Sequence, residues 1–262
     1  MLESRQVTKF FGEIKAVDSV SAAVEDGSVY GLIGTNGAGK STFLRMAAGI
    51  LKPDSGNVFI DGQQVFENIA VKQKVFYIPD EPYFLPNAAL EDMEVYYSAV
   101  YKQFDRARFR EMSEQFGLVR RCKVATFSKG MKKQLAILLG LCSGVSYLLC
   151  DETFDGLDPV MRQAVKSIFA KEVEERKLTP IIASHNLREL EDICDHVGLL
   201  HRGGILFSKD LYEMKLDIHK VQCVLQENGS DIEELCKKLD VMKKEQRGRL
   251  CTLTLRGNKE EI

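Results

Sequence analysis

The stretch Gly34-Thr-Asn-Gly-Ala-Gly-Lys-Ser-Thr42 decides the fold of this chain, because it fits the pattern G-x-x-x-x-G-K-S/T. The apolar run just before it, residues 29–33, is typical of a buried parallel strand, and residues 42–48 after it are good helix formers. Between a strand and a helix, such a loop turns backbone N–H groups and the positive helix end toward phosphate oxygens. We therefore expect a P-loop that binds a nucleoside triphosphate.

The residues of this loop have expected roles. Lys40 is expected to reach the β- and γ-phosphates, and the Ser41 hydroxyl is expected to ligate Mg²⁺. The other candidate nucleotide-binding residues of the loop are Gly34, Asn36, Gly37, Ala38, Gly39 and Thr42. A glycine turn that happens to precede a lysine is the plainer alternative, and the complete match between a strand and a helix argues against it.

A pair of carboxylates follows a second buried strand. Residues 145–150 are apolar and lead directly into Asp151 and Glu152. The carboxyl ends of parallel strands are where such sheets place their ligands. Asp151 is expected to hold Mg²⁺ through water, and Glu152 to orient or deprotonate the attacking water. An Asp-Glu pair at a strand end is often just surface, but the P-loop upstream argues against that reading here.

Four further segments are informative because of the order in which they follow one another along the chain. They are Phe11 in Lys-Phe-Phe-Gly, Phe127-Ser-Lys-Gly-Met131, Phe154-Asp-Gly-Leu-Asp158 and His185. In this order they resemble the adenine-contacting aromatic residue, the signature, the D-loop and the switch histidine of the nucleotide-binding subunit of ABC transporters. The resemblance covers about residues 1–208.

The resemblance assigns a role to each segment. It implies that each ATP lies between the P-loop of one subunit and the signature residues Ser128 and Gly130 of another. It also implies that Phe11 stacks on adenine and that His185 contacts the γ-phosphate. An aromatic residue near the start of a domain is often plain core, and Phe10 competes for the adenine role.

The chain departs from the family pattern in three places. Asp80 stands where the family usually has Gln, and it is kept as a candidate metal ligand that approaches Mg²⁺ through a water. Lys129 and Met131 replace Gly and Gln in the signature, and Asp155 replaces the commoner Ser of the D-loop. None of these changes removes the lysine, the metal ligands or the glutamate, so we expect catalysis to survive.

Composition narrows the function further. The 262 residues carry 36 Lys or Arg against 38 Asp or Glu, so the chain lacks the overall positive charge that would indicate nucleic-acid binding. A basic surplus at 102–133 is either a solvated helix face or a surface that faces anionic lipid or a partner's nucleotide. Seven cysteines without metal-type spacing indicate reduced thiols in a cytosolic protein, and the polar start of the chain shows no signal peptide.

The longest apolar run, residues 135–150, is too short to cross a bilayer, which takes roughly 20 residues. We expect it to be a buried helix, a turn at Ser143-Gly144 and then the strand that leads to the carboxylates. A second apolar feature, residues 83–85, lies among prolines. These side chains either tuck under the neighbouring helices or, as the resemblance implies, line a groove for a cytoplasmic helix of a membrane subunit.

The order of elements predicts an α/β fold. It is a P-loop NTPase core with a mostly parallel sheet, an N-terminal antiparallel β subdomain and an inserted helical subdomain at about 87–142. Residues 1–208 are expected to form the ATPase domain. Residues 209–262 are expected to form a small α+β appendage, incomplete here or completed by a partner, with a strand at 220–226, a helix at 231–239 and a strand at 250–255.

The resemblance implies a function for the whole chain. It implies an ATPase that binds ATP and Mg²⁺, pairs as a homodimer or with a second such subunit, and powers a separate integral membrane permease of the bacterial ABC-2 exporter type. Such a subunit is cytoplasmic and peripheral on the inner face of the cell membrane. The alternative is a non-transport ABC ATPase of the cluster-assembly type that acts on a soluble partner. A regulatory module that holds ATP without hydrolysis is a third reading, against which Glu152 and His185 argue.

Overall fold

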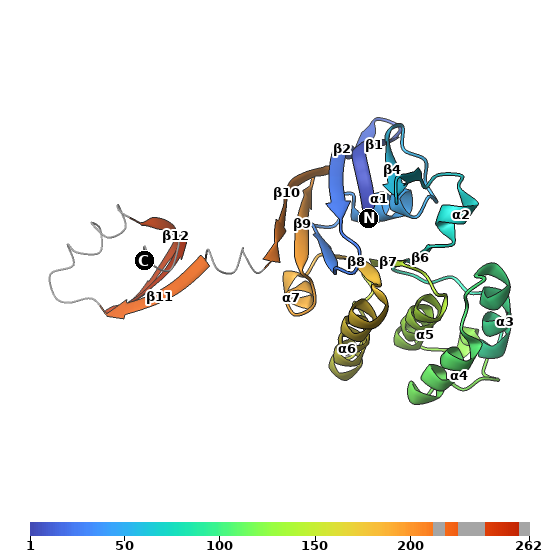
Figure 1. Ribbon diagram of the computed structural model, residues 1–262. Helices are drawn as coiled ribbons and strands as arrows, with labels where there is room; N and C mark the ends of the chain where they lie inside the picture. Colours follow the sequence, from blue (N-terminus) through green and yellow to red (C-terminus); the bar gives the residue numbers. More distant parts are fainter. Residues whose placement is uncertain (212–217, 225–238, 257–262) are drawn as a thin grey trace. The chain divides into compact units, whose positions relative to one another are not determined.

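Figure 1 shows a computed structural model of the chain, which describes residues 1–211, 218–224 and 239–256. Its contacts divide the chain into two compact units, Met1–Ser208 and Lys209–Ile262. The first unit contains a four-stranded and a six-stranded sheet, and the second contains a three-stranded sheet of its own.

The four-stranded sheet is antiparallel and begins the chain. Its strands lie in the order β2 (Ile14–Val24), β1 (Leu2–Phe11), β4 (Ser55–Ile60) and β5 (Gln63–Gln64). β1 and β2 form a hairpin because Gly12, with φ of 59°, takes a turn conformation that glycine adopts without penalty. Val7 and Val20 from this sheet are fully buried in the core that also holds Phe43. The sheet therefore covers the helix that follows the P-loop.

The six-stranded sheet carries the P-loop and the carboxylates. Its strands lie in the order β10 (Gly204–Asp210), β9 (His196–His201), β3 (Tyr30–Ile33), β8 (Thr179–Ser184), β7 (Tyr147–Asp151) and β6 (Val75–Ile78). β3 pairs in parallel with β8 and β9, and β7 pairs in parallel with β6 and β8. Every residue of β7 and β8 is buried, as expected of central parallel strands covered on both faces. Their carboxyl ends therefore meet at one edge.

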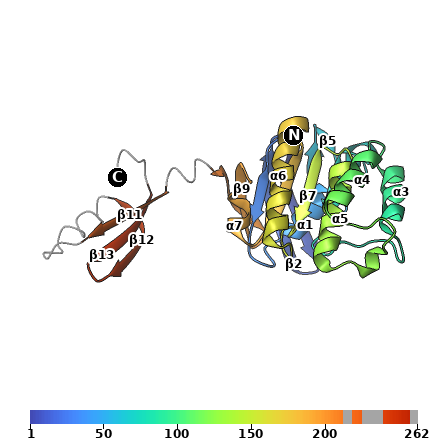
Figure 2. The same ribbon diagram turned by 90° about the horizontal axis from the view of Figure 1, so that it is seen from below.

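Helices cover the sheets and form a group beside β6 and β7. The helices of the first unit are α1 (Lys40–Ala47), α2 (Ile69–Lys72), α3 (Leu90–Val100), α4 (Arg106–Gln115), α5 (Lys129–Cys142), α6 (Pro159–Arg176) and α7 (Leu187–Leu190). Figures 1 and 2 both place α3, α4 and α5 together next to β6 and β7. α5 packs tightly on these strands, since a Cβ at Gly140 would lie 2.6 Å from a methyl of Leu148. This close contact holds α5 rigidly against the sheet.

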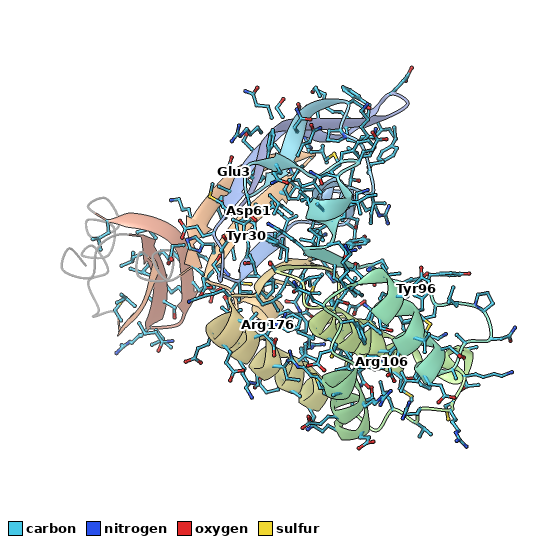
Figure 3. All side chains as sticks on the ribbon, turned by 45° about the vertical axis from the view of Figure 1, so that its right-hand side comes forward. Glu3, Tyr30, Asp61, Tyr96, Arg106 and Arg176 are labelled. Carbon is cyan, nitrogen blue, oxygen red and sulfur yellow. The ribbon has the colours of Figure 1, made fainter. Side chains whose placement is uncertain are left out.

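Two buried glutamates tie this helical group together. Glu94 on α3 is paired with Arg106 and Arg110 of α4 at 2.7 and 2.8 Å. Glu172 on α6 is paired with Arg108 of α4 and with Arg176 of its own helix. Figure 3 labels Arg106 and Arg176, which lie on the helices below the sheet. A buried carboxylate that loses its partner costs about 3–5 kcal/mol, so these pairs fix the helices relative to one another.

The second unit is small. Its sheet has the order β11 (Ile218–Val224), β13 (Leu250–Arg256), β12 (Asp240–Arg247), with antiparallel pairing. Cys251, Leu253 and Leu255 form its buried core. The strands expected at 220–226 and 250–255 correspond to β11 and β13, β12 was not expected, and the helix expected at 231–239 lies outside the described residues except for its last one.

The structure confirms the expected fold class. The parallel sheet, the N-terminal antiparallel sheet and the helical group at α3–α5 are all present. The apolar run is a helix that ends at Cys142, a turn, and the strand β7, as expected. Within the described residues, none of the helices has the length and apolar character that crossing a bilayer requires.

Candidate functional site

The P-loop lies between the end of β3 and the start of α1, at residues 34–39. Gly39 precedes α1 with φ of 103°, and a Cβ there would lie 2.3 Å from the carbonyl oxygen of Ala16. Only glycine fits this position, because a side chain would collide with the backbone. Within the described chain no side chain caps α1. The N–H groups of its first turn are thus available to an anion.

The side chains of Lys40, Glu152 and His185 meet at the carboxyl edge of the sheet. Nζ of Lys40, a side chain only 5% exposed, lies 3.2 Å from Oε1 of Glu152. It also donates to the carbonyl oxygen of Gly34 at 2.7 Å. The other carboxylate oxygen of Glu152 lies 2.9 Å from Nδ1 of His185. The structure thus brings the three expected catalytic residues together from α1, the end of β7 and the end of β8.

Asp151 lies beside this group and is 1% exposed. Its two oxygens accept hydrogen bonds from the hydroxyls of Ser41 and Tyr77, each at 3.0 Å. Burial raises the pKa of Asp151, and the two hydroxyls only partly oppose that effect. Burial, followed by the charge of Asp151, raises the pKa of Tyr77 to about 12. Asp151 is therefore a buried carboxylate held by neutral donors, next to the serine expected to bind metal.

Asp80 has a different partner from the one expected. Its carboxylate lies 3.0 Å from Nζ of Lys133, a lysine of α5 that is fully buried. The same Nζ donates to the backbone carbonyl of Glu152 at 2.6 Å. A role for Asp80 at the metal stays a prediction, and the contact that the structure gives this carboxylate is an ion pair.

The remaining candidate residues lie elsewhere. Ser128 is exposed and caps α5, where its Oγ accepts from the N–H of Met131 at 3.2 Å. Gly130 follows in the first turn of α5, close to the backbone of Gly156. Phe11 and its competitor Phe10 are both exposed at the end of β1. The structure therefore does not separate these two as adenine contacts.

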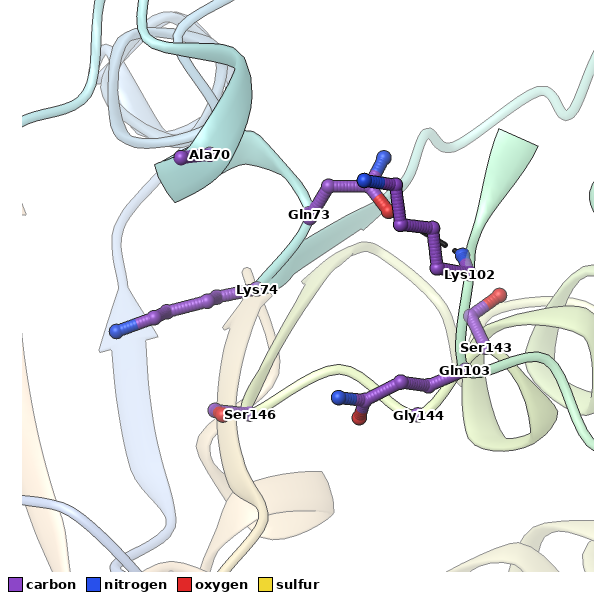
Figure 4. Close-up of a pocket in the computed structure, with 8 residues that line it drawn as sticks. All are labelled: Ala70, Gln73, Lys74, Lys102, Gln103, Ser143, Gly144 and Ser146. Atoms are coloured by element: carbon purple, nitrogen blue, oxygen red, sulfur yellow. Dashed lines mark hydrogen bonds between the residues drawn. The ribbon is translucent and has the colours of Figure 1, made fainter.

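A hollow of about 380 Å³ lies at the other edge of the sheet (Figure 4). It is lined in part by Lys74, Lys102 and Ser146. Lys74 and Ser146 come just before β6 and β7, whereas the carboxylates follow the end of β7. Nζ of Lys74 is already paired with Asp61 at 2.6 Å. This hollow is separate from the site around the P-loop.

The sequence model of the ABC transporter family matches residues 17–155, which is more than half of the chain. The chain belongs to this family. As an ABC transporter ATP-binding protein, it binds ATP, and its activity is ATP hydrolysis.

Individual relatives agree with this assignment. The ABC transporter ATP-binding protein YtrB of Bacillus subtilis (strain 168) is 29% identical over 261 residues, which cover 100% of this chain and 88% of the relative. The bacitracin transport ATP-binding protein BcrA of Bacillus licheniformis is 33% identical over 209 residues, 79% of this chain and 68% of the relative. A solved structure described as the ATP binding subunit of an ABC transporter has a TM-score of 0.75 and 26% identity, with 82% of this chain and 92% of that one covered.

Two residues of the ABC ATPase site were not expected from the sequence. Tyr77 lies within β6, where it reads as part of a buried strand, and Lys133 lies in a run of lysines after the signature. Their contacts with Asp151 and Glu152 join elements that are far apart in sequence. The Tyr-x-Pro sequence at residues 77–79 is the only sequence signal for Tyr77, and the sequence contains no signal for Lys133.

Replacement of Asp151 by Asn should stabilise the nucleotide-free, metal-free protein at neutral pH. The folded pKa of Asp151 lies above the ordinary 3.8, so the stability that its protonated form contributes is present below pH 3.8. That stability is lost as pH rises through the folded pKa. Asp151→Asn removes the buried charge and keeps the shape. Urea unfolding in a chelating buffer should give a larger free energy of unfolding than for the wild type.

Asp54→Asn is the matched control with the opposite sign. Lys9, followed by the N–H of Phe10, lowers the pKa of Asp54, so its stabilising effect is present above pH 3.8 and is lost as pH falls. Asp54→Asn should therefore leave the protein less stable at neutral pH. Shifts of the same sign in both variants would contradict this account of Asp151.

Proposed function

We propose that two copies of this chain, or one copy and a related subunit, enclose ATP between them and drive a separate integral membrane permease. The observation that carries the proposal is the exposed amino end of α5. Ser128 and Gly130 stand at the start of a helix of 14 residues, on an element other than those that hold the P-loop. An exposed helix amino end favours an anion, and a twofold arrangement would give it the phosphates of a second copy.

The residues around Asp151 fit a magnesium ion. Mg²⁺ prefers hard oxygen ligands and usually keeps several waters, with one or two protein ligands plus the phosphates. Asp151 and Ser41 supply such oxygens side by side, and the buried carboxylate lacks a cation of its own among its hydrogen-bond partners. Among the described residues there is no group of three or more metal-binding side chains, which suits a metal that comes with the nucleotide. The ion would neutralise charge on the phosphates.

The contacts of Glu152 support a role in hydrolysis. In the nucleotide-free protein its carboxylate balances Lys40 and is oriented by His185. An arriving γ-phosphate would take the place of Glu152 beside Lys40, and Glu152 would then accept a proton from the attacking water. His185 would keep the carboxylate oriented and contact the γ-phosphate. Phe11, exposed at the end of β1, is proposed to stack on the adenine.

The permease is proposed to meet the segment that follows β6. Tyr83 is 76% exposed and Leu85 is also exposed, which is unusual for large apolar side chains between prolines. Such a patch would accept a short helix of a membrane subunit and would hold the chain on the inner face of the membrane. We infer export as the direction because a relative that is 31% identical over 212 residues, LnrL of Bacillus subtilis (strain 168), is named for linearmycin resistance, which removal of that compound from the cell would give. Nucleic acid is not part of the proposal.

Glu152→Gln should slow ATP hydrolysis by roughly 10²–10⁴, the usual effect of losing a general base. Nucleotide binding should persist, because Lys40 and the P-loop are unchanged, and the ATP-bound variant should elute as a dimer in gel filtration. Phosphate release and gel filtration with and without ATP are the measurements. Glu175→Gln, at an exposed glutamate of α6, is the control and should behave as wild type. An unaltered hydrolysis rate in Glu152→Gln would remove this residue from the reaction.

Composite sites predict that two inactive variants complement each other. Lys40→Ala removes the phosphate contact, and Ser128→Asp keeps the cap of α5 but places a negative charge against the partner's phosphates. Each homodimer should be inactive. Mixed dimers, purified through two different tags, contain one intact site and should recover about half of the wild-type rate if the sites act independently.

The control for this experiment uses the same mutations in another arrangement. A dimer of the double variant Lys40→Ala/Ser128→Asp with a wild-type chain has one defect in each composite site, so it should stay inactive. The opposite pattern, with activity in the dimer of the double variant with wild type and none in the other mixed dimer, would show that each chain completes its own site.

The permease proposal is tested by co-purification from membranes. The tagged chain, solubilised in detergent from its native host, should carry an integral membrane protein that mass spectrometry identifies. Tyr83→Ser/Leu85→Ser should reduce its yield severalfold without a change in melting temperature. Val160→Ser, at an equally exposed apolar residue of α6, is the control. A soluble partner in place of a membrane protein would support a non-transport ATPase instead.

A further inference from the structure

The ammonium group of Lys133 is buried under the site, although no role in ATP chemistry requires it there. Lys133 lies on α5, its side chain is 0% exposed, and Nζ has two partners. One partner is the carboxylate of Asp80 at 3.0 Å, and the other is the backbone carbonyl of Glu152 at 2.6 Å. A buried cation is tolerated only where such partners satisfy it. The contact with Glu152 places Lys133 directly behind the residue proposed to activate water.

The backbone of Glu152 needs this support. Its φ of 47° lies in the left-handed region, which costs a residue other than glycine free energy and persists only where neighbours enforce it. The N–H of Glu152 donates to the carbonyl of Ala183 on β8 at 3.0 Å. Its carbonyl accepts from Nζ of Lys133 and from the N–H of Asp155. Lys133 thus provides the side-chain hydrogen bond to the carbonyl oxygen of Glu152.

Asp80 completes the arrangement from a third element. It follows β6, its side chain is 48% exposed, and its carboxylate lies 3.0 Å from the buried Nζ. An aspartate occupied in this way has its charge already neutralised. The contact therefore offers an alternative to the metal role expected of Asp80.

We propose that Lys133 is a positioning residue that holds Glu152 where it can accept a proton from the attacking water, and that Asp80 is the counter-ion of Lys133. This inference rests on the proposed role of Glu152. Nζ of Lys133 contacts the carbonyl of Glu152 and the carboxylate of Asp80, so Lys133 would act through the peptide that it holds. Because Ser128 begins the same helix, the element that would meet the partner's ATP also sets the geometry of the chain's own glutamate.

The first test separates turnover from binding. Lys133→Met keeps the length of the side chain and removes its charge and donor, so Glu152 should lose its alignment. A misplacement of about 1 Å can cost on the order of 10²-fold in rate, and we expect kcat to fall about 10–100-fold. Affinity for ATP, measured by equilibrium binding, should stay within about threefold, since the P-loop is intact. Lys133→Gln keeps a donor, but its amide lies one bond closer to the backbone, so it should restore the rate only in part.

Lys166→Met is a matched control. Lys166 on α6 is also a buried lysine, 8% exposed, paired with an exposed carboxylate, that of Asp192 at 3.3 Å. Its replacement should lower the melting temperature about as much as Lys133→Met and leave kcat unchanged. Equal losses of kcat in both variants would mean that the effect of Lys133 is only structural, and the inference would be wrong.

The second test decides the role of Asp80. If Asp80 serves only Lys133, then Asp80→Asn should lower kcat in the wild-type background and change it less than about twofold in Lys133→Met. If Asp80 instead binds the metal, Asp80→Asn should raise the Mg²⁺ concentration needed for half-maximal activity equally in both backgrounds. The second result would overturn the counter-ion role. It can be read even if Lys133→Met folds poorly, because Lys133→Gln can replace it as the background.

Glu152→Gln separates this inference from the proposed function. In a Glu152→Gln chain, Lys133→Met should have no further effect on the residual rate, because its target is gone. If Glu152→Gln is inactive but Lys133→Met turns over ATP at the wild-type rate, the inference fails and the proposed function stands. If Glu152→Gln hydrolyses ATP normally, the proposed role of Glu152 fails first.

Discussion

The ion pair between Lys40 and Glu152 is the interaction on which the rest of the site depends. A nearly buried ammonium group needs an anion, and the carboxylate provides one at 3.2 Å. A triphosphate can take over this place, since it brings more negative charge to the same cation. In the proposed mechanism the carboxylate would then be released toward the attacking water, still oriented by His185. In this proposal, ATP replaces Glu152 as the ion-pair partner of Lys40, and the same exchange frees Glu152 to act as the base.

The same site carries costs that only the surrounding fold can offset. Asp151 is a buried anion held by two hydroxyls, and Glu152 next to it has an unfavourable φ. Asp151 is the last residue of β7 and Glu152 follows it, and the five residues of β7 are all buried between β6 and β8. A strand paired on both sides and packed on both faces cannot relax toward a better local conformation. The central position of β7 therefore keeps a strained, charged pair in place at the sheet edge.

The parts of the site that could be predicted are those formed by residues that are consecutive in the sequence. The P-loop follows from nine residues and their flanking strand and helix, and the fold class follows because such a loop needs a parallel sheet to carry it. The roles of Tyr77 and Lys133 could not be read in this way. Each depends on which residue of one element faces which residue of another, and Lys133 lies 53 positions from Asp80. The strand β12 was missed because its Lys and Glu residues hide the alternation of a strand.

The pairing of Asp80 with Lys133 also explains how the chain tolerates its departure from the family pattern. An aspartate in place of glutamine adds negative charge near the site of a polyanion, and alone it would weaken ATP binding. Lys133 on α5 offsets that charge at 3.0 Å, although solvent partly screens the pair because Asp80 is 48% exposed. Nζ of Lys133 also donates to the carbonyl of Glu152, so the ion pair with Asp80 is linked to the residue that follows β7. The ion pair that offsets the charge of Asp80 thus also supports the backbone of Glu152, the proposed base.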